Sequence, residues 1–374
     1  MADLQYHLVY PEANNTNDGF VQFNSVDFIL LADGRKMVKN SVVVEYDLEV
    51  FSTGATPVLI GDMIGLENKI GGHSFMESWS CEVQSVGNIE QINEYPRWVN
   101  MIASASKDQN DFMSAFSQAE GRQLREAGGR YVCQPVASNS SQGATIKTSA
   151  NFTIKPQVCF NNMTGDDYSF SKNGYAKISF NCARNSNALF GSGATASNYK
   201  LKNVVLRFMS VEDDNKQGAM LMNSVSSLKQ TINSQQANIL SRVPSDKVNG
   251  VVISFLEQAH ETNATDNSYA LEQLPQLDEV QYLFSDSTAR YITYTMDDYD
   301  DMILKGIEAL SESGVNMCHS SKLSANKGTI IGLAFSEYID LRSQKFSVQL
   351  KNSSAGISSN PRLVYLFFST LIQL

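Results

Sequence analysis

Short stretches of alternating hydrophobic and polar residues recur along the whole chain. From Val42 to Val50 the even-numbered positions are apolar, and the odd-numbered positions become acidic after Val43. A strand with one face in a core and the other in water has this period of two. Four further stretches alternate in the same way: 176–182, 204–209, 291–296 and 345–350. Polar, turn-forming loops separate them, so the pattern predicts an all-β protein of sandwiches or barrels.

Three segments with helical spacing interrupt the predicted strands. The first helix is expected to start at Tyr95, because Pro96 suits the first helical turn. The second covers residues 108–127. The third begins in the acidic run 297–301 and keeps its apolar residues at helical spacing up to Gly314, where it should stop. Helices this few and short are expected to lie in the connections between strands.

The order of segments in the first half of the chain is repeated in the second half. Four pairs of weakly similar segments follow one another in the same order: 72–83 with 274–284, 92–95 with 296–299, 177–186 with 345–353, and 201–209 with 363–368. A shared order indicates duplication of one β unit. The polar, glycine-ended stretch between the halves suits a linker. We therefore expect an arm (1–18), a first unit (19–212), a linker (213–219) and a second unit (220–374).

Length and composition support two cores and a surface that is partly covered. The chain has 374 residues, of which 42% are hydrophobic, enough to fill two domains of roughly 150–200 residues each. Only 18% are charged, below the roughly 25% that is usual for soluble domains. We interpret this shortage as a sign that neighbouring subunits cover much of the surface. The net charge of −10 argues against direct binding to nucleic acid, which needs clustered Lys and Arg.

The cysteines and the chain ends indicate a protein that folds in a cytoplasm. The five cysteines are widely spaced, without a Cys-x-x-Cys pair: Cys81, Cys133, Cys159, Cys182 and Cys318. This spacing argues against a zinc ribbon or redox motif, and the odd count in a long chain predicts reduced, buried thiols. The first residues lack the basic-then-apolar pattern of a signal peptide, and the apolar stretch 363–374 is too short to span a bilayer.

The residue types that carry catalysis or bind metals do not fall into a recognisable constellation. No two of the four histidines, His7, His73, His260 and His319, are spaced as metal ligands. Cys318 and His319 resemble a nucleophile–base pair, but adjacent residues on a strand point to opposite faces. We therefore predict no catalytic, cofactor-binding or metal site, and no enzymatic activity.

Two further motifs have a structural interpretation that we prefer. Asp297, Asp298, Asp300 and Asp301 could bind a divalent cation, but they lack the spacing of an EF-hand loop and suit the N-terminus of the third helix. The segment 191–193 lacks the Gly-Lys-Ser/Thr of a phosphate loop and is interpreted as a turn.

Aromatic residues lie within or beside the alternating segments, which favours core packing over a ligand platform. The residues concerned are Trp79, Trp98, Phe160, Phe180, Phe190 and Phe208.

Several segments of the first half resemble those of a known family. They are 70–74 before a strand, 94–96 before a helix, the strand 177–182, the loop 188–191 and the strand 203–211. With two similar β-rich halves, the chain resembles the double jelly-roll major capsid proteins of membrane-containing tailless bacteriophages, adenoviruses and large DNA viruses of eukaryotes. The resemblance covers about residues 19–374, and the size is closer to the smaller, bacteriophage-like members than to the adenovirus hexon.

The resemblance implies a fold and a function. The fold would be two tandem eight-stranded jelly rolls, and the function a capsid subunit that forms homotrimers, six similar wedges that tile an icosahedral shell. Such a chain would be made in the host cytoplasm and would end in the virion. Its partners would be other copies of itself and minor capsid or penton proteins, with an internal membrane nearby. The alternative from another class is a β-sandwich lectin or receptor-binding spike protein.

The first residues are expected to serve as an arm. Residues 11–18 are polar and turn-rich, which suits a connector. Before them Leu4, Tyr6, Leu8 and Tyr10 alternate with other residues. We expect residues 1–16 to pack apart from the first jelly roll, as an added edge strand or along a partner protein. Because the arm lacks Lys and Arg, strong attachment to anionic lipid is not expected.

Overall fold

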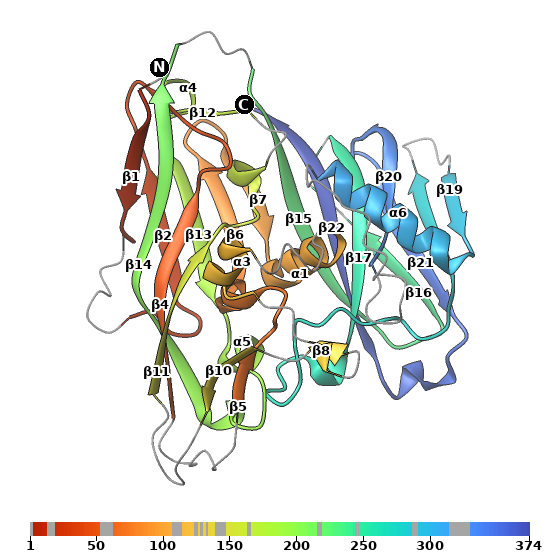
Figure 1. Cartoon of the computed structure of the whole chain (residues 1–374). Helices are drawn as coiled ribbons and strands as arrows, with labels where there is room; N and C mark the ends of the chain where they lie inside the picture. Colours follow the sequence, from red (N-terminus) through yellow and green to blue (C-terminus); the bar gives the residue numbers. More distant parts are fainter. Residues whose placement is uncertain are drawn as a thin grey trace.

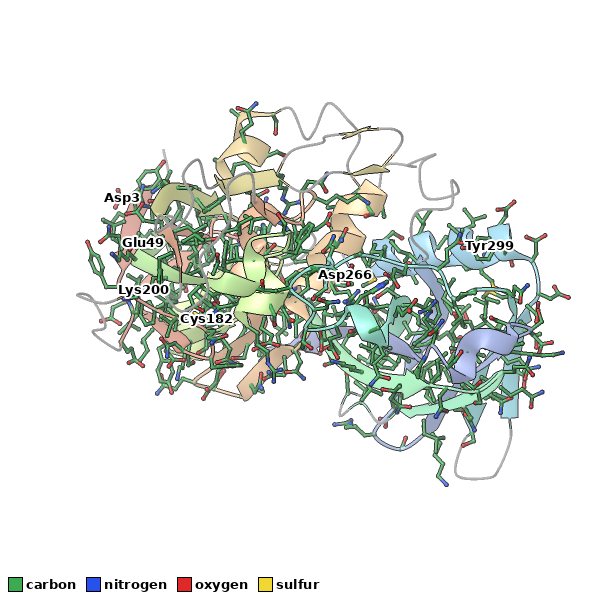
Figure 2. All side chains as sticks on the ribbon, turned by 90° about the horizontal axis from the view of Figure 1, so that it is seen from below. Asp3, Glu49, Cys182, Lys200, Asp266 and Tyr299 are labelled. Atoms are coloured by element: carbon green, nitrogen blue, oxygen red, sulfur yellow. The ribbon has the colours of Figure 1, made fainter. Side chains whose placement is uncertain are left out.

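The chain forms two β-sandwiches that stand side by side, as the computed structural model shows (Figure 1). The structure describes residues 3–12, 19–52, 63–106, 114–122, 126–127, 130–131, 134–138, 147–162, 166–214, 219–241, 243, 245, 247–285, 291–313 and 330–374. Figure 2 shows the same two blocks from below, with Asp3 at the outer end of the first, Tyr299 at the outer end of the second and Asp266 between them.

Two facing sheets form the first sandwich. One sheet contains β1 (Gln5–Val9), β14 (Ser197–Glu212), β4 (Val43–Ser52) and β11 (Lys147–Ile154), with β3 (Arg35–Met37) and β12 (Tyr168–Ser169) continuing beside β14. The other contains β2 (Ser25–Leu30), β13 (Ala176–Cys182), β6 (Met76–Val83) and β7 (Gly87–Ile92). Two short pairs lie outside them, β5 (Met63–Leu66) with β10 (Gln134–Ser138) and β8 (Glu126–Ala127) with β9 (Arg130–Tyr131).

Helices in the first sandwich connect its strands. Among the described residues the longest is α1 (Tyr95–Ser106), and the short ones are η1 (Gly71–Phe75), α3 (Ala115–Ala119), η2 (Cys159–Asn161), α4 (Phe170–Asn173), α5 (Asn185–Ala188) and η3 (Ala194–Ala196).

The second sandwich has two sheets of four strands. One contains β15 (Leu221–Ile232), β22 (Arg362–Gln373), β17 (Val248–Glu257) and β20 (Ile330–Ile339); the other contains β16 (Gln236–Ser241), β21 (Lys345–Asn352), β18 (Leu277–Ser285) and β19 (Tyr291–Met296). Its helices are η4 (Gln258–His260), α6 (Tyr299–Glu312) and η5 (Ala355–Ser358).

The two sandwiches have the same connectivity, which confirms the predicted repeat. The pairs β1·β14, β4·β14, β4·β11, β2·β13, β6·β13 and β6·β7 correspond in order to β15·β22, β17·β22, β17·β20, β16·β21, β18·β21 and β18·β19, and all are antiparallel. A helix follows the fifth strand of each set, α1 after β7 and α6 after β19. Eight strands with this connectivity form a jelly roll, so the predicted double jelly roll is confirmed.

Strand composition follows from what covers each face. In β4 the side chains of Val44, Tyr46, Leu48 and Val50 are buried, while the residues between them are half-buried. In β17 almost every residue is buried, because the facing sheet covers one side and α6 packs on the other. The alternating pattern of β4 and the continuous apolar run of β17 therefore have the same cause, the number of covered faces.

The two jelly rolls are joined edge to edge. Strand β7 lies parallel to β15, so that four strands of each roll form one eight-stranded sheet. Beside this contact the Ser224 hydroxyl donates to the carbonyl oxygen of Ile89 at 2.7 Å, and the Asn93 N–H donates to the Ser227 hydroxyl at 2.8 Å. The joint is therefore made by backbone pairing and side-chain hydrogen bonds together.

Helix α1 bridges the same joint. The Trp98 ring stacks on Phe367 of β22, with centroids 5.5 Å apart. The buried Arg97 guanidinium lies 3.9 Å from the centre of the Tyr365 ring and donates to the carbonyl oxygens of Ala270 and Ser268 at 2.7 and 2.5 Å. These contacts bury a helix of the first roll against the second, which resists rotation of one roll relative to the other.

Two of the three predicted helices are confirmed. α1 begins at Tyr95, and α6 begins beside the acidic run, as expected. The continuous helix over residues 108–127 is wrong within the described residues, because α3 ends at Ala119 and Gly121 takes a φ of +73°. That left-handed conformation stops a helix. Residues 108–113 and 123–125 of this prediction, and Gly314, lie outside the described residues.

The N-terminal segment contributes a strand to the first jelly roll. We expected residues 1–16 to pack apart from it, but β1 pairs with β14 over its whole length, from Gln5 opposite Ser210 to Val9 opposite Leu206. The backbone N–H and C=O groups along the edge of β14 can pair with one more strand, and β1 forms hydrogen bonds with them. The prediction that the N-terminal residues pack apart from the first jelly roll is therefore wrong for the residues of β1, which form an edge strand of that roll. Residues 13–18 lie outside the described residues.

The predicted core aromatics are confirmed, with one exception. Trp79, Trp98, Phe160, Phe180 and Phe208 are buried, whereas Phe190 is half-buried. Tilted ring contacts join Trp79 to Phe180 at 5.3 Å across β6 and β13.

Close packing of α6 on β20 depends on glycines. A Cβ atom added to Gly332 would lie 2.5 Å from the Val251 carbonyl oxygen and 3.2 Å from the Cα of Gly306. We expect Gly332→Ala to lower the free energy of unfolding by about 1–3 kcal/mol, because the backbone has to shift to admit the methyl group. Thermal unfolding followed by circular dichroism measures the change. Gly356→Ala is the control, since the nearest atom to its added Cβ is 3.8 Å away; equal unfolding midpoints for both variants would contradict this account.

Candidate functional site

The acidic run before α6 acts as a helix cap. The Asp298 carboxylate accepts hydrogen bonds from the N–H groups of Asp300 and Asp301 at 2.8 and 3.3 Å, and these two acids lie in the first turn. This is the helix-capping role that we preferred over cation binding. Cys318 and His319 lie outside the described residues.

The histidines in the described part of the chain lie in three separate places. His7 is on β1, His73 is in η1, and His260 is in η4 at an end of the second roll. The structure therefore keeps these three histidines apart. This agrees with the sequence, in which no two histidines are spaced as metal ligands.

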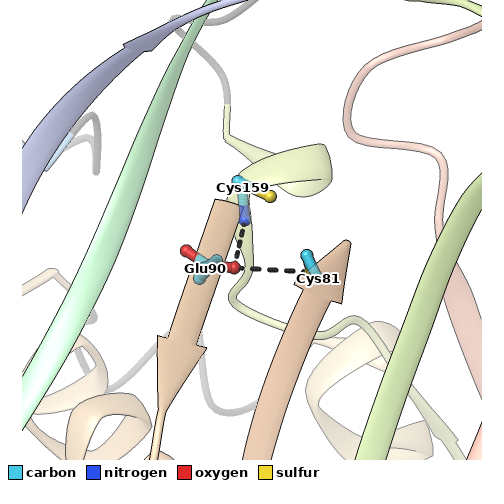
Figure 3. A group of neighbouring side chains, drawn as sticks. All are labelled: Cys81, Glu90 and Cys159. Atoms are coloured by element: carbon cyan, nitrogen blue, oxygen red, sulfur yellow. Dashed lines mark hydrogen bonds between the residues drawn. The ribbon is translucent and has the colours of Figure 1, made fainter. Parts of the chain in front are cut away.

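The structure brings together three residues that the sequence did not single out. Cys81 of β6, Glu90 of β7 and Cys159 of η2 meet in the core, with one ligand atom of each within 4.8 Å of the others (Figure 3). One Glu90 carboxylate oxygen accepts from the Cys159 N–H at 2.8 Å and lies 3.6 Å from the Cys81 sulfur. The other accepts from the Val225 N–H of β15 at 3.1 Å. Glu90 thus ties both jelly rolls together from inside.

Burial decides the charge of this cluster. Desolvation is the largest effect on Glu90 and raises its pKa to about 7. Hydrogen bonds from the backbone N–H groups of Cys159 and Val225 lower the pKa, but by less. Desolvation also raises the pKa of Cys81 to about 11 and that of Cys159 well above its usual range. Thiols that stay protonated are poor nucleophiles and poor metal ligands. The geometry therefore suits a buried hydrogen-bond centre better than a metal or catalytic site.

No sequence signal pointed to this cluster. Glu90 faces inward because the register of β6 and β7 shifts between Cys81 and Glu82, which turns two consecutive residues, Ile89 and Glu90, into the core. A bulge of this kind breaks the period of two on which the sequence argument depends.

A second buried polar network surrounds His73. Its Nδ1 lies 2.9 Å from the Tyr95 hydroxyl, and its Nε2 lies 3.2 Å from a Glu120 oxygen and 3.0 Å from an Arg122 nitrogen. Glu120 and Arg122 form an ion pair at 2.7 Å. All of these side chains are buried, so a substrate cannot reach them. Their hydrogen bonds fix the segment after α3 against η1, where the Gly72 N–H also donates to the Glu120 carbonyl oxygen at 2.8 Å.

A third group of ionisable residues is partly open to solvent. The Glu272 carboxylate lies 2.6 Å from His260 Nδ1 and accepts from the Glu257 N–H at 2.6 Å. Arg362 forms an ion pair with Glu257. The guanidinium compensates the Glu257 carboxylate, and the Glu272 carboxylate has His260 and the Glu257 N–H as partners, so each carboxylate has a partner without a bound cation.

The described part of the second jelly roll contains surface pockets at two places. One, of about 310 Å³, is on the outer edge at β19 and β20 and is lined by Phe284, Tyr294, Phe335 and Tyr338 among others. The other, of about 490 Å³, is polar, with Gln236, Gln281, Gln349 and Lys351 in its wall. Neither contains a nucleophile–base pair. Among the described residues, no helix has the length and apolar character needed to cross a membrane.

Solved viral proteins have the same fold. The Faustovirus major capsid protein gives a TM-score of 0.64 at 11% identity, covering 100% of this chain and 90% of that one. A protein in the cryo-EM structure of the Sputnik virophage gives 0.56 at 9% identity, covering 99% and 85%. The mavirus major capsid protein gives 0.50 at 9% identity, covering 98% and 86%. No protein-family model and no curated protein sequence matches the chain. The likeness establishes the fold over the whole length of the chain.

The raised pKa of Glu90 predicts a pH-dependent stability. Its folded-state pKa of about 7 lies above the ordinary 4.5, so between these values the folded chain binds more protons than the unfolded one. The stabilising contribution of the protonated Glu90 to the free energy of unfolding is fully present below pH 4.5 and is lost as the pH rises through 7. We expect Glu90→Gln to flatten the fall in unfolding free energy between pH 5 and 8, by up to a few kcal/mol.

Denaturant unfolding at several pH values measures this slope. Glu308→Gln, which changes an exposed carboxylate on α6, is the control and should keep the slope of the unsubstituted chain. If Glu90→Gln keeps that slope too, Glu90 does not titrate in this range.

Proposed function

We propose that this chain is a major capsid protein that assembles as a homotrimer and tiles an icosahedral virus shell. The observation that supports this best is the rigid double jelly roll itself. Each roll is a wedge with two antiparallel sheets around one core. Three chains with two wedges each give six similar wedges, which close into a nearly hexagonal tile.

The joint between the rolls suits this role. Tiles in a lattice need wedges at a fixed angle, and the contact of β7 with β15, covered by α1, holds the two rolls in one position. We propose to divide the chain at residues 213–219, between the end of β14 at Glu212 and the start of β15 at Leu221; residues 215–218 lie outside the described residues. A single-wedge lectin or receptor-binding protein has no need of a fixed joint of this kind, so the architecture favours the capsid function over that alternative.

The partners follow from assembly and charge. They are other copies of this chain, first within the trimer and then between capsomers, and minor capsid or penton proteins. Because its net charge is −10, the chain does not bind nucleic acid directly; other proteins make that contact. An internal membrane lies near the chain, which does not bind it strongly. The chain is made in the host cytoplasm and resides in the virion; a bacteriophage origin stays a prediction.

Trimer formation is the first test of the proposal. Light scattering on the purified chain should give about three times the chain mass of 41.3 kDa, and negative-stain images should show hexagonal tiles or shells. A stable monomer at micromolar concentration, with discrete small particles in the images, would count against a capsomer and in favour of a lectin.

The absence of chemistry is the second test. Cys318→Ala and His319→Ala should each affect folding or assembly only, since neither residue is assigned a catalytic role. Hydrolytic and redox assays on both variants and the unsubstituted chain provide the measurement. An activity that disappears with either side chain would overturn the structural assignment.

A further inference from the structure

The edge strand β1 points its apolar residues away from the protein. Its inward positions are His7 and Val9, which are half-buried, with His7 stacked on Phe208 at a centroid distance of 4.5 Å. The opposite face carries four large apolar side chains with these exposed fractions: Leu4 46%, Tyr6 78%, Leu8 57% and Tyr10 68%. A strand of a sandwich normally has the reverse pattern, with apolar residues inside.

Specific contacts hold this orientation. A shift of one residue would turn the apolar face inward. Against such a shift, His7 Nε2 lies 2.7 Å from the Ser210 hydroxyl, and the Arg35 guanidinium pairs with the Asp3 carboxylate at 3.3 Å. The outward apolar face is thus built into the register of the strand.

The outward face of β1 is large enough for a protein contact. Its four apolar side chains together expose on the order of 400 Å² of apolar surface. This area is within the range of the largest apolar patch on a monomer and is about half of what one side of a stable interface buries.

A matching surface lies at the opposite end of the molecule. The pocket at β19 and β20 is rimmed by Tyr294 and Tyr338, which are 47% and 54% exposed, and Phe284 and Phe335 form its floor. These two strands are the outer edges of the second jelly roll, as β1 and β2 are of the first. In Figure 2 the labels Asp3 and Tyr299, which flank these edges, lie at the two far ends.

We propose that the outward face of β1 in one copy packs against the β19–β20 edge of the next copy, with Tyr6 and Leu8 meeting the pocket of Tyr294 and Tyr338. The inference rests on the proposed capsomer function and names its contact surface. Because the two surfaces are different and lie at opposite ends, the contact is head-to-tail and generates a ring instead of an isologous dimer. Apolar side chains enter an aromatic pocket, and the exposed area of both is removed from water.

Polar substitution on the outward face tests the contact. The double variant Tyr6→Ser with Leu8→Ser should shift the mass in light scattering from three chains to one, with circular dichroism and the unfolding midpoint close to those of the unsubstituted chain. Leu240→Ser on β16 is the matched control and should stay trimeric, since Leu240 is 65% exposed but lies at the other end of its sheet from β19. A double variant that stays trimeric overturns the β1 contact and leaves the capsid function standing. An unsubstituted chain that is monomeric contradicts the capsid function itself.

Cross-linking tests the direction of the contact independently of stability. A chain with both Leu8→Cys and Tyr338→Cys, treated with a short bis-maleimide, should give covalent products that end at three chain masses. Each single variant, and the unsubstituted chain as background, should give none. Dimers from Leu8→Cys alone would show that β1 meets β1, and an uncross-linked double variant would show that the two edges do not meet; either result overturns the proposal.

Discussion

The fixed joint between the two jelly rolls is the interaction on which the rest of the structure depends. Each roll closes its own core, so a flexible connection would leave two independent wedges. Pairing of β7 with β15 and the burial of Arg97 and Trp98 against the second roll remove that freedom. Two domains joined by a small polar interface move relative to each other by default. Here the apolar and hydrogen-bonded contacts of α1 turn them into one block with a defined outline.

Buried polar groups make the packing at this joint specific, although they reduce its net stability. Glu90 is buried and is stabilised by hydrogen bonds from two backbone N–H groups and contact with a thiol, one N–H belonging to the second roll. An alternative packing would leave these groups without partners, which costs about 1–3 kcal/mol for each. The His73 network has the same effect inside the first roll. Such groups add little net stability, but they penalise other arrangements of the same strands.

The outer edges of the molecule differ from each other, and the proposed head-to-tail contact depends on this asymmetry. A sheet edge with free backbone groups invites uncontrolled pairing. The first roll pairs the edge of β14 with β1, whose outward face carries exposed apolar side chains. The second roll presents an aromatic pocket. Surfaces that differ at the two ends favour a closed ring over an open stack when the angle between the wedges is fixed.

The sequence by itself determined the class of fold, the duplication and the absence of a recognisable catalytic motif. Alternation with a period of two is a local property, and so are the start of α1 at Tyr95 and the cap at Asp298. The order of similar segments was sufficient to identify β6, β13 and β14 with β18, β21 and β22. Only the tertiary structure decided which strands lie at edges, because pairing depends on residues far apart in the chain. It placed β1 in the first roll and brought Cys81, Glu90 and Cys159 together through a register shift that no local pattern records. It also turned the apolar face of β1 outward, since a period of two tells which residues share a face but not which face meets the core.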